Sequence, residues 1–183
     1  MTISILIGST RTGRLSPRAA RLVESALNKV FSDKVQIFDL KDFEIPFLTE
    51  RLKYLSDPHP DIVRFSRVIQ ESSALIVVSP EYNGGTPGVL KNALDHLNSE
   101  YDNLPVGLVT VSAGPHGGPG VLASLQTFFT RVGACVLKPH LQINEIADTL
   151  DEKGKDRKNI YAESLSAFVK AIQAVMNTGS TAR

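Results

Sequence analysis

Short apolar runs alternate with amphipathic helical patterns along almost the whole chain. The most informative run is residues 74–79, Ala-Leu-Ile-Val-Val-Ser, because it is apolar at successive positions and so suits a strand that is covered on both faces. A helical pattern follows nearly every such run, which indicates repeated strand–helix–strand units. The chain is therefore predicted to form an α/β fold with a parallel sheet, helices on both faces and right-handed crossovers.

The apolar runs and helical periods set the expected bounds of the elements. Strands are predicted at residues 3–7, 35–40, 74–79, 106–112 and 135–141. Helices are predicted at residues 17–31, around residues 62–69, and at residues 88–97, 121–132 and 159–176. Ser16 is expected to cap the first helix, and Gly133 to close the helix at 121–132. One domain is expected over residues 1–183.

The charge balance limits the partners and the location of the chain. Its 20 Lys and Arg against 19 Asp and Glu give a formal net charge of +1, so neither nucleic acid nor a membrane surface is expected as a partner. No apolar run approaches the ~20 residues of a membrane span, and the N-terminal run lacks a basic leader. A cytoplasmic protein is expected. Its one cysteine, Cys135, is predicted to be a core thiol in a reducing compartment.

Ligands of open parallel sheets bind beyond the carboxyl ends of the strands, where three loops of this chain should meet. The first, residues 8–16, joins a strand to a helix start, where free N–H groups and the helix dipole attract anions. Hydroxyl and guanidinium donors crowd this loop: Ser9, Thr10, Arg11, Thr12, Arg14 and Ser16. Arginine forks pair well with phosphate oxygens. The loop is therefore predicted to bind a phosphate, with a flexible polar turn as the alternative.

Two nucleotide-binding motifs fit loop 8–16 poorly. Gly8 and Gly13 have the glycine spacing of a P-loop, but Arg14 follows where that motif requires lysine. A dinucleotide-binding G-x-G-x-x-G motif would need glycine in place of Thr10. Asp39, at the end of the second predicted strand, resembles the acid that binds ribose in such folds, but an aspartate there is common by chance. A nucleotide-hydrolysing enzyme is therefore disfavoured.

The other two loops are rich in glycine and proline. Residues 79–88, Ser-Pro-Glu-Tyr-Asn-Gly-Gly-Thr-Pro-Gly, form a stiff strip whose glycines let a ligand approach the backbone. A flat heteroaromatic ring needs such N–H and C=O groups, and Tyr82 and Asn83 add a ring face and an amide. Residues 112–120 lack bulky side chains and are expected to wrap a ligand, with His116 either a candidate acid or a solvated side chain. Ordinary turns are the alternative for both loops.

Side chains that could catalyse a reaction by themselves form no recognisable motif. No nucleophile, base and orienting group occur together, and no His or Cys cluster has metal-ligand spacing. A cofactor that carries the chemistry itself would explain this lack. We therefore expect neither a catalytic side chain nor a metal site.

Together, these motifs resemble the NADPH-dependent FMN reductase family, which includes flavodoxin-like quinone reductases and azoreductases. The resemblance rests on Gly8-Ser9-Thr10-Arg11 with Ser16 and, above all, on the long run at residues 79–95, and it covers roughly residues 3–140. It implies a flavodoxin-like three-layer sandwich with a five-stranded parallel sheet in the order 2-1-3-4-5. It also implies a homodimer or homotetramer with the helix at 88–97 in the interface.

The same resemblance implies a binding site for FMN. The phosphate would lie at Ser9, Arg11 and Ser16, with Thr10 and Arg14 nearby. The isoalloxazine would contact mainly backbone atoms of Pro80, Glu81, Tyr82, Asn83 and Gly84. The ring or ribityl chain would be flanked by Ser112, Gly114, His116 and Gly117.

The implied activity is that of an NAD(P)H:acceptor oxidoreductase. NADPH or NADH would deliver hydride, and a quinone, azo compound, free flavin or metal oxyanion would take electrons at the same face in a ping-pong cycle. The alternative is a flavodoxin-type electron carrier or a flavin-binding regulatory module. A net charge of +1 counts against a carrier, because flavodoxin carriers tend to be strongly acidic.

Overall fold

A computed structural model of the protein describes residues 1–32 and 34–177. Its strands are β1 (Thr2–Ile7), β2 (Lys34–Asp39), β3 (Ala74–Pro80), β4 (Pro105–Val111), β5 (Cys135–Val136) and β6 (Leu141–Ile143). Its helices are α1 (Ser16–Leu27), α2 (Pro60–Gln70), α3 (Gly88–Asp95), α4 (Pro119–Arg131), α5 (Ile146–Thr149) and α6 (Ala162–Asn177). Short 3₁₀ turns lie at Leu40–Asp42, Leu52–Tyr54 and Ser99–Tyr101.

The strands form one parallel sheet in the order β2-β1-β3-β4-β5, and β6 also pairs with β4. β1 is an interior strand, with Ile5 beside Ile37 of β2 on one side and beside Ile76 of β3 on the other. The predicted strand order is therefore confirmed. Because the chain moves from β1 outward to β2 and then back across to β3, the loops after β1 and β3 leave the sheet in different directions. A ligand crevice is expected at this point of a parallel sheet.

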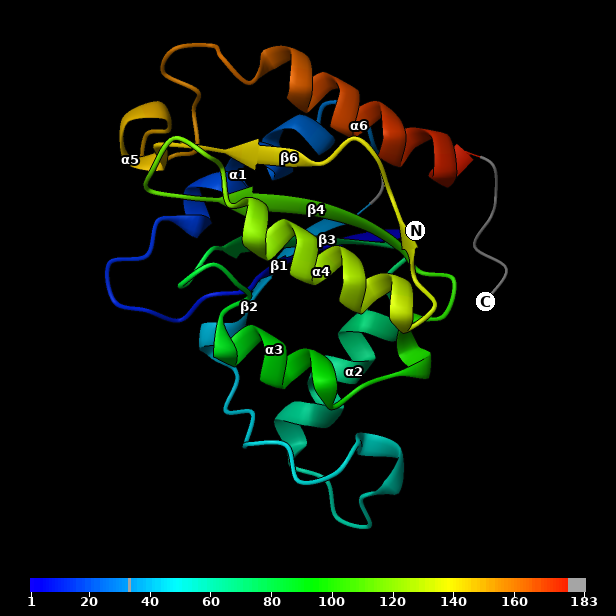
Figure 1. Ribbon diagram of the computed structural model, residues 1–183. Helices are drawn as coiled ribbons and strands as arrows, with labels where there is room; N and C mark the ends of the chain where they lie inside the picture. Colours follow the sequence, from blue (N-terminus) through cyan, green and yellow to red (C-terminus); the bar gives the residue numbers. More distant parts are fainter. Residues whose placement is uncertain (33, 178–183) are drawn as a thin grey trace.

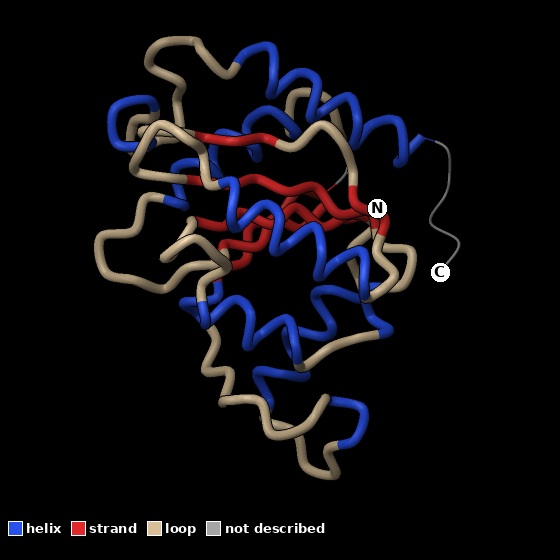
Figure 2. Tube along the Cα trace, viewed as in Figure 1, coloured by secondary structure: helices blue, strands red, loops and turns tan. Residues whose placement is uncertain are grey.

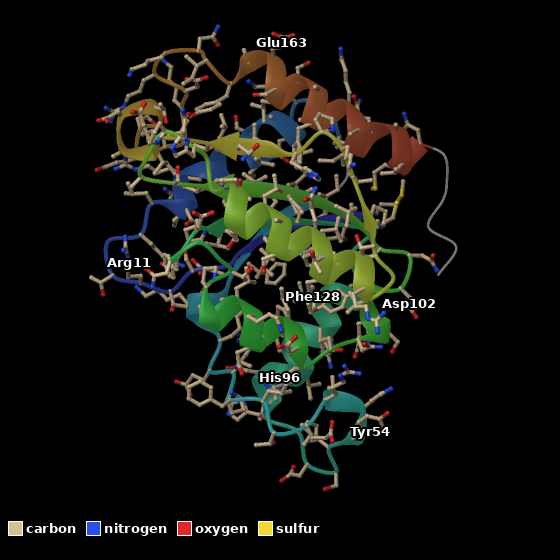
Figure 3. All side chains as sticks on the ribbon, in the orientation of Figure 1. Arg11, Tyr54, His96, Asp102, Phe128 and Glu163 are labelled. Atoms are coloured by element: carbon tan, nitrogen blue, oxygen red, sulfur yellow. The ribbon has the colours of Figure 1, made fainter. Side chains whose placement is uncertain are left out.

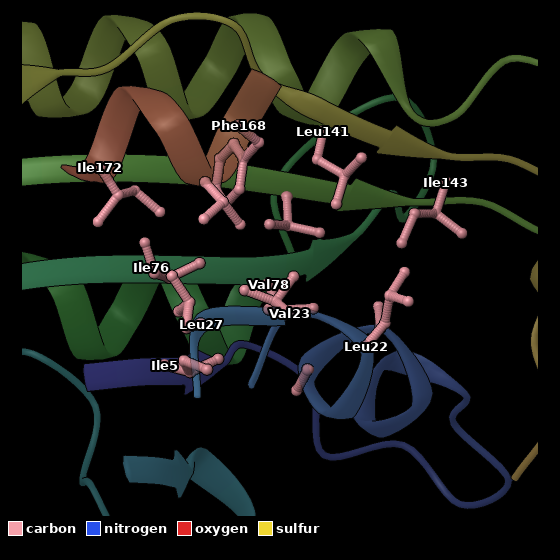
Figure 4. Close-up of a cluster of buried hydrophobic side chains, with 14 of the residues drawn as sticks. Ile5, Leu22, Val23, Leu27, Ile76, Val78, Leu141, Ile143, Phe168 and Ile172 are labelled. Carbon is pink, nitrogen blue, oxygen red and sulfur yellow. The ribbon is translucent and has the colours of Figure 1, made fainter. Parts of the chain in front are cut away.

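Helices cover both faces of the sheet, as Figure 1 shows. α1 and α6 lie over one face, and α2, α3 and α4 lie over the other. Figure 4 shows the first of these layers, where Val23 of α1 and Phe168 of α6 pack on Ile5 and Ile76 of the strands. Burial of each such side chain contributes about 1.5–3 kcal/mol to the stability of the folded state. The two layers hold the sheet as a rigid framework for the loops at its carboxyl edge.

The region predicted as one strand at residues 135–141 is two short strands. β5 covers Cys135–Val136, and β6 begins at Leu141 after a gap. Pro139 lies in that gap and has no N–H to donate to a sheet ladder, which explains the break. β6 then pairs with residues 109–111 at the end of β4, so this part of the chain also reaches the carboxyl edge.

Cys135 is exposed, and the prediction of a core thiol is wrong. Leu137, just beyond β5, is buried, whereas Cys135 stands at the start of this edge strand with its side chain accessible. The apolar residues around it made the stretch look buried, but a two-residue edge strand is covered on few of its sides.

The predicted helices are present, with shifted ends. α1 stops at Leu27 rather than residue 31, and Val30 beyond it is 43% exposed. α6 starts at Ala162 rather than residue 159, because Asn159 adopts a left-handed conformation with φ +53°. α4 starts two residues earlier than predicted, at Pro119, where proline suits the first helical position. Gly133 follows it with φ +79°, as the predicted helix end requires.

Candidate functional site

The three glycine-containing loops meet at one edge of the sheet, on the left in Figure 2. They enclose a cleft with about 540 Å³ of empty space up to its open mouth. The cleft is lined by Arg11, Arg14, Leu15, Ser16, Pro80, Glu81, Tyr82, Val111, Ser112, Ala113 and Ile146. Of the predicted site residues, the remaining ones stand beside this lining without forming part of it: Ser9, Thr10, Asn83, Gly84, Gly114, His116 and Gly117.

Loop 8–16 begins with a close contact to the opposite helix layer. The N–H of Gly8 donates to the carbonyl of Val78 in β3, at 2.9 Å. A Cβ on Gly8 would stand 2.5 Å from Cδ2 of Leu90 in α3, which is far inside contact distance. A side chain at position 8 would therefore require Leu90 to shift.

Arg14 is held by a carboxylate that the sequence did not lead us to pair with it. Its guanidinium donates to both carboxylate oxygens of Asp39 and to the carbonyl of Ser9. The two side chains are only 13% and 17% exposed. The fork of Arg14 therefore closes loop 8–16 onto the end of β2. Asp39 serves as its anchor and also accepts the N–H of Lys41 at 3.0 Å.

The N-terminus of α1 is open toward the cleft. Ser16 is the first helical residue and Leu15 occupies the capping position without any side-chain bond, so the predicted Ser16 cap is wrong. The Ser16 hydroxyl instead faces the Ser9 hydroxyl at 3.2 Å, and both side chains are buried. The first turn of α1 contains no acidic residue. Pro17 has no N–H, and the Arg18 N–H donates to the Leu15 carbonyl at 2.9 Å. The Ser16 N–H and the positive dipole end of the helix are what this terminus offers to an anion.

Arg11 is the exposed cation at the mouth of the cleft, and Figure 3 labels it on loop 8–16. Its guanidinium carbon lies 5.5 Å from the ring centroid of Tyr82 across the cleft, within cation–π range. Among the described residues no carboxylate is paired with Arg11. Unlike Arg14, it is available to a ligand.

Loop 79–88 is held by backbone bonds. The N–H of Glu81 donates to the carbonyl of Val111 in β4 at 3.1 Å, which continues the sheet one step beyond β3. Tyr82 and Gly85 exchange two N–H···O bonds of 3.0 and 3.1 Å. Between them Asn83 and Gly84 both have positive φ, as a tight type I′-like turn requires. Asn83 and Gly84 therefore form an exposed turn tip rather than the wall of the cleft.

Two side chains of this loop have contrasting partners. The hydroxyl of Tyr82 is buried and has no hydrogen-bond partner among the described residues. A buried hydroxyl without a partner is costly, so this one is a candidate contact for a ligand. The carboxylate of Glu81, by contrast, accepts the N–H groups of Gly120 and Val121 at the start of α4.

Loop 112–120 is organised by Ser112. Its hydroxyl donates to the carbonyl of Gly114 at 2.6 Å and accepts the N–H of Gly117 at 3.0 Å. The hydroxyl of Thr110 donates to the carbonyl of Gly117 at 2.5 Å. His116 is exposed on this loop and does not line the cleft.

The wall formed by Ile146 was not predicted. Ile146 begins the short helix α5 directly after β6, and its N–H donates to the carbonyl of Ser112 at 3.2 Å. The rule that placed the other loops, namely that carboxyl ends of parallel strands share an edge, also applies to the end of β6. The last strand was predicted to end at residue 141, so this segment was not recognised as part of the edge.

Two further site types receive no support from the described residues. No group of three or more His, Cys, Asp or Glu side chains within residues 1–32 and 34–177 could hold a metal ion. In the same ranges no helix is long and apolar enough to cross a membrane.

The chain is similar to several known proteins. A family model described as NADPH-dependent FMN reductase matches residues 1–148. An NAD(P)H-dependent FMN reductase of Saccharomyces cerevisiae is 30% identical over 131 residues, which cover 64% of this chain and 68% of that one. A quinone reductase of Pseudomonas putida is 29% identical over 187 residues, covering 95% and 97%. A solved flavoenzyme NAD(P)H:acceptor oxidoreductase of Paracoccus denitrificans shares the fold, with a TM-score of 0.79, 22% identity and coverage of 94% and 97%.

Proposed function

The chain belongs to the NADPH-dependent FMN reductase family, and from this premise we propose that its cleft binds FMN and reduces small acceptors with NADPH or NADH. The observation that carries the proposal is the pairing of an open helix end with a rigid backbone strip across one cleft. The first suits a phosphate and the second suits a flat ring with polar edges. The enzyme is thus an oxidoreductase with FMN as its cofactor.

Loop 8–16 supplies the phosphate end of the proposed site. Suitable donors are the Ser16 N–H at the start of α1, the hydroxyls of Ser9, Thr10 and Ser16, and the guanidinium of Arg11, which pairs with no carboxylate among the described residues. Arg14 does not join them in our proposal, because Asp39 already occupies its fork. Its role is to hold the loop in the shape that presents the other donors.

Loop 79–88 supplies the ring end. The strip from Pro80 to Tyr82 lines the cleft, and the ring of Tyr82 suits a flat ligand. Loop 112–120 closes the opposite side with Ser112 and Ala113. Gly114 and Gly117 shape that loop around the Ser112 hydroxyl, and His116 at its exposed tip remains a candidate ring-edge donor.

Bound FMN supplies the redox chemistry, accepting hydride and passing on electrons. The protein binds and orients, and no side chain in the cleft needs to act as acid or base. Because one open cleft serves both the nicotinamide and the acceptor, the two would occupy it in turn, and ping-pong kinetics are expected. Relatives are named quinone reductase, NADPH azoreductase and 2-hydroxy-1,4-benzoquinone reductase, so quinones, azo compounds and free flavin are the proposed acceptors.

A binding and turnover experiment tests this function. Purified protein is refolded with FMN, washed free of excess, and mixed with NADPH or NADH in the presence and absence of a quinone. Bound flavin that bleaches with the nicotinamide and recovers with the quinone supports the reductase. A protein that remains colourless overturns the proposal. Bound flavin that only a partner protein can reduce would instead identify an electron carrier.

We propose a homodimer or homotetramer that uses the region around α3. Phe47 is 91% exposed, and Leu48, Tyr54 and Val89 add further exposed apolar surface near it. The Leu48 N–H donates to Asn92 of α3 at 2.9 Å, so this loop lies against the helix. The buried apolar residues of α3, such as Leu90 and Leu94, pack into the protomer core and are not available to a second copy. Light scattering after gel filtration tests this: Phe47→Glu should shift the assembly toward monomer, and an unchanged mass would contradict it.

Two coarser features complete the proposal. Helices from opposite ends of the chain, α1 and α6, pack on the same face of the sheet, which supports a single domain over residues 1–183. A lone cysteine suits a reducing compartment, so a cytoplasmic location is proposed.

A further inference from the structure

The N-terminus of α4 is capped by a side chain from a distant loop. Gly118 precedes the helix without a side-chain bond, and Pro119 has no N–H. The first N–H groups that need acceptors are those of Gly120 and Val121. Both donate to Oε2 of Glu81, at 2.6 and 3.0 Å. A carboxylate from loop 79–88 therefore satisfies the helix end and also its positive dipole.

The backbones of the two loops also touch at this point. A Cβ on Gly120 would stand 2.2 Å from the carbonyl oxygen of Gly84 and 3.0 Å from Oε2 of Glu81. A second bond lies one turn further along α4, where the hydroxyl of Thr86 donates to that of Ser124 at 2.9 Å. Loop 79–88 and the start of α4 thus pack directly against each other, with the Glu81 carboxylate bonding across the contact.

Glu81 also contributes to the cleft through its backbone. The Glu81 N–H bonds β4, and the residue lies between Pro80 and Tyr82 in the strip that lines the cleft. A side chain fixed to α4 and an N–H fixed to β4 leave this strip little freedom. Glu81 therefore links the two ring-facing loops, 79–88 and 112–120, through both its side chain and its backbone.

The two helix N-termini near the cleft are consequently different. The end of α1 has no carboxylate in its first turn and no side-chain cap, whereas the end of α4 is filled by Glu81. An external anion would therefore favour the α1 end. Because the carboxylate of Glu81 fills the end of α4, only the α1 end of the cleft is left for a phosphate.

We infer that Glu81 is a positioning residue that fixes the ring-binding strip to α4 and leaves α1 as the phosphate end. This inference deepens the proposed function and rests on it for the flavin measurements. It assigns the carboxylate no direct contact with the flavin, because both of its strong bonds go to α4.

Three variants at one position separate hydrogen bonding from charge. Glu81→Gln keeps a carbonyl oxygen that can accept both N–H groups, Glu81→Asp keeps the charge on a shorter side chain, and Glu81→Ala removes the acceptor. The matched control is Glu163→Ala, which removes a carboxylate from the first turn of α6, at the top of Figure 3 and far from the cleft. FMN affinity is measured by fluorescence quenching. Hydrogen exchange of peptides covering residues 80–87 and 117–123 is measured in the apoprotein.

We expect Glu81→Ala and Glu81→Asp to weaken FMN binding about tenfold or more, and to broaden the visible absorption bands of the bound flavin. Exchange should become faster in both peptides together. Glu81→Gln should restore binding to within about fivefold, the part that charge against the helix dipole accounts for. Glu163→Ala should change neither measurement.

Three results would overturn the inference. One is FMN binding and exchange in Glu81→Ala that match the wild type. Another is weaker binding with unchanged exchange, which would make the carboxylate a direct ligand contact. The third is Glu81→Gln failing as badly as Glu81→Ala, which would point to charge alone. If Glu81→Ala does not fold, Glu81→Asp against Glu81→Gln decides. Exchange needs no cofactor, so it still decides the inference if the wild type binds no FMN and the proposed function fails.

Discussion

Replacing each of the two arginines of loop 8–16 by alanine should have opposite effects. Arg14→Ala should mainly lower the stability of the fold, and Arg11→Ala should mainly weaken binding of the phosphate. Arg14 makes a two-pronged ion pair with Asp39 and a bond to the Ser9 carbonyl, with both charged side chains less than a fifth exposed. Hydrogen bonds to charged groups contribute about 1.5–3 kcal/mol when buried, and exposed pairs 0–1 kcal/mol. This pair lies between those limits, and Arg14→Ala would leave the Asp39 carboxylate without its partner. The variant should therefore lower the free energy of unfolding by about 2 kcal/mol.

For a chain of this length that cost corresponds to a fall in Tm of about 4–8 °C. Arg11→Ala should change the free energy of unfolding by less than about 0.5 kcal/mol, because the side chain is exposed and has no carboxylate partner among the described residues. Thermal and urea unfolding of the apoproteins measure both. A cycle that adds Asp39→Ala should show a coupling energy of about 1 kcal/mol or more between Arg14 and Asp39.

Recognition of the flavin phosphate should be affected more by Arg11→Ala than by Arg14→Ala, the opposite of the order expected for stability. Riboflavin lacks the phosphate of FMN. The affinity for FMN divided by the affinity for riboflavin therefore measures the contribution of the phosphate contact. Arg11→Ala should lower that ratio about 10- to 100-fold, and the loss should shrink at high salt. Arg14→Ala should weaken both flavins and change the ratio by less than about threefold. If Arg14→Ala lowers the ratio more than Arg11→Ala does, the assignment of the two side chains is wrong.

Three further outcomes follow from single positions. Gly8→Ala should cost about 1–3 kcal/mol in urea unfolding, because its Cβ would press on Leu90; a stable variant would show that α3 gives way. Burial, and then Lys138, lowers the pKa of His140 below 6.5, so below that pH the unfolded chain binds more protons and stability falls as pH drops. His140→Gln should flatten this fall, which sets in as the pH drops through about 6.5, and an unchanged slope would exclude His140 as its source. Cys135 should react with a thiol reagent in the folded protein, and Cys135→Ser should leave Tm unchanged; slow reaction limited by unfolding would contradict its exposure.

The strands that the sequence predicts well are those covered on both faces. β3 and β4 are buried at nearly every position, and their continuous apolar runs predict strands directly. The helices beside them are predicted from the helical period of their apolar residues. The fifth strand was misjudged because residues 135–141 were taken as one run, although Lys138 and Pro139 interrupt its apolar residues and a proline in a ladder removes a donor. The exposure of Cys135 could not be inferred from its apolar neighbours, because adjacent residues of a strand face opposite sides.

The site was predictable as a set of loops but less so as a set of side-chain partners. Gly8, Pro80 and Ser112 lie at the ends of β1, β3 and β4, and parallel strands bring these ends to one edge of the sheet. The partner of Arg14 lies 25 residues away on β2, and that of Glu81 lies on α4. Register offers one usable clue: Ile7 pairs with Asp39, which places that carboxylate beside the start of loop 8–16. No comparable clue marks the Glu81 bonds, because they depend on how α4 sits over the sheet.

The cleft rests on two different parts of the sheet. The proposed phosphate end depends on β1, α1 and the end of β2, whose shifts would disturb the core. The wall formed by Ile146 follows a strand of only three residues that pairs with β4. Ile146 and Leu150 nevertheless belong to the same buried cluster as β1 and α1. Insertions or deletions at residues 144–149 are therefore expected to change this wall of the cleft and the packing behind it together.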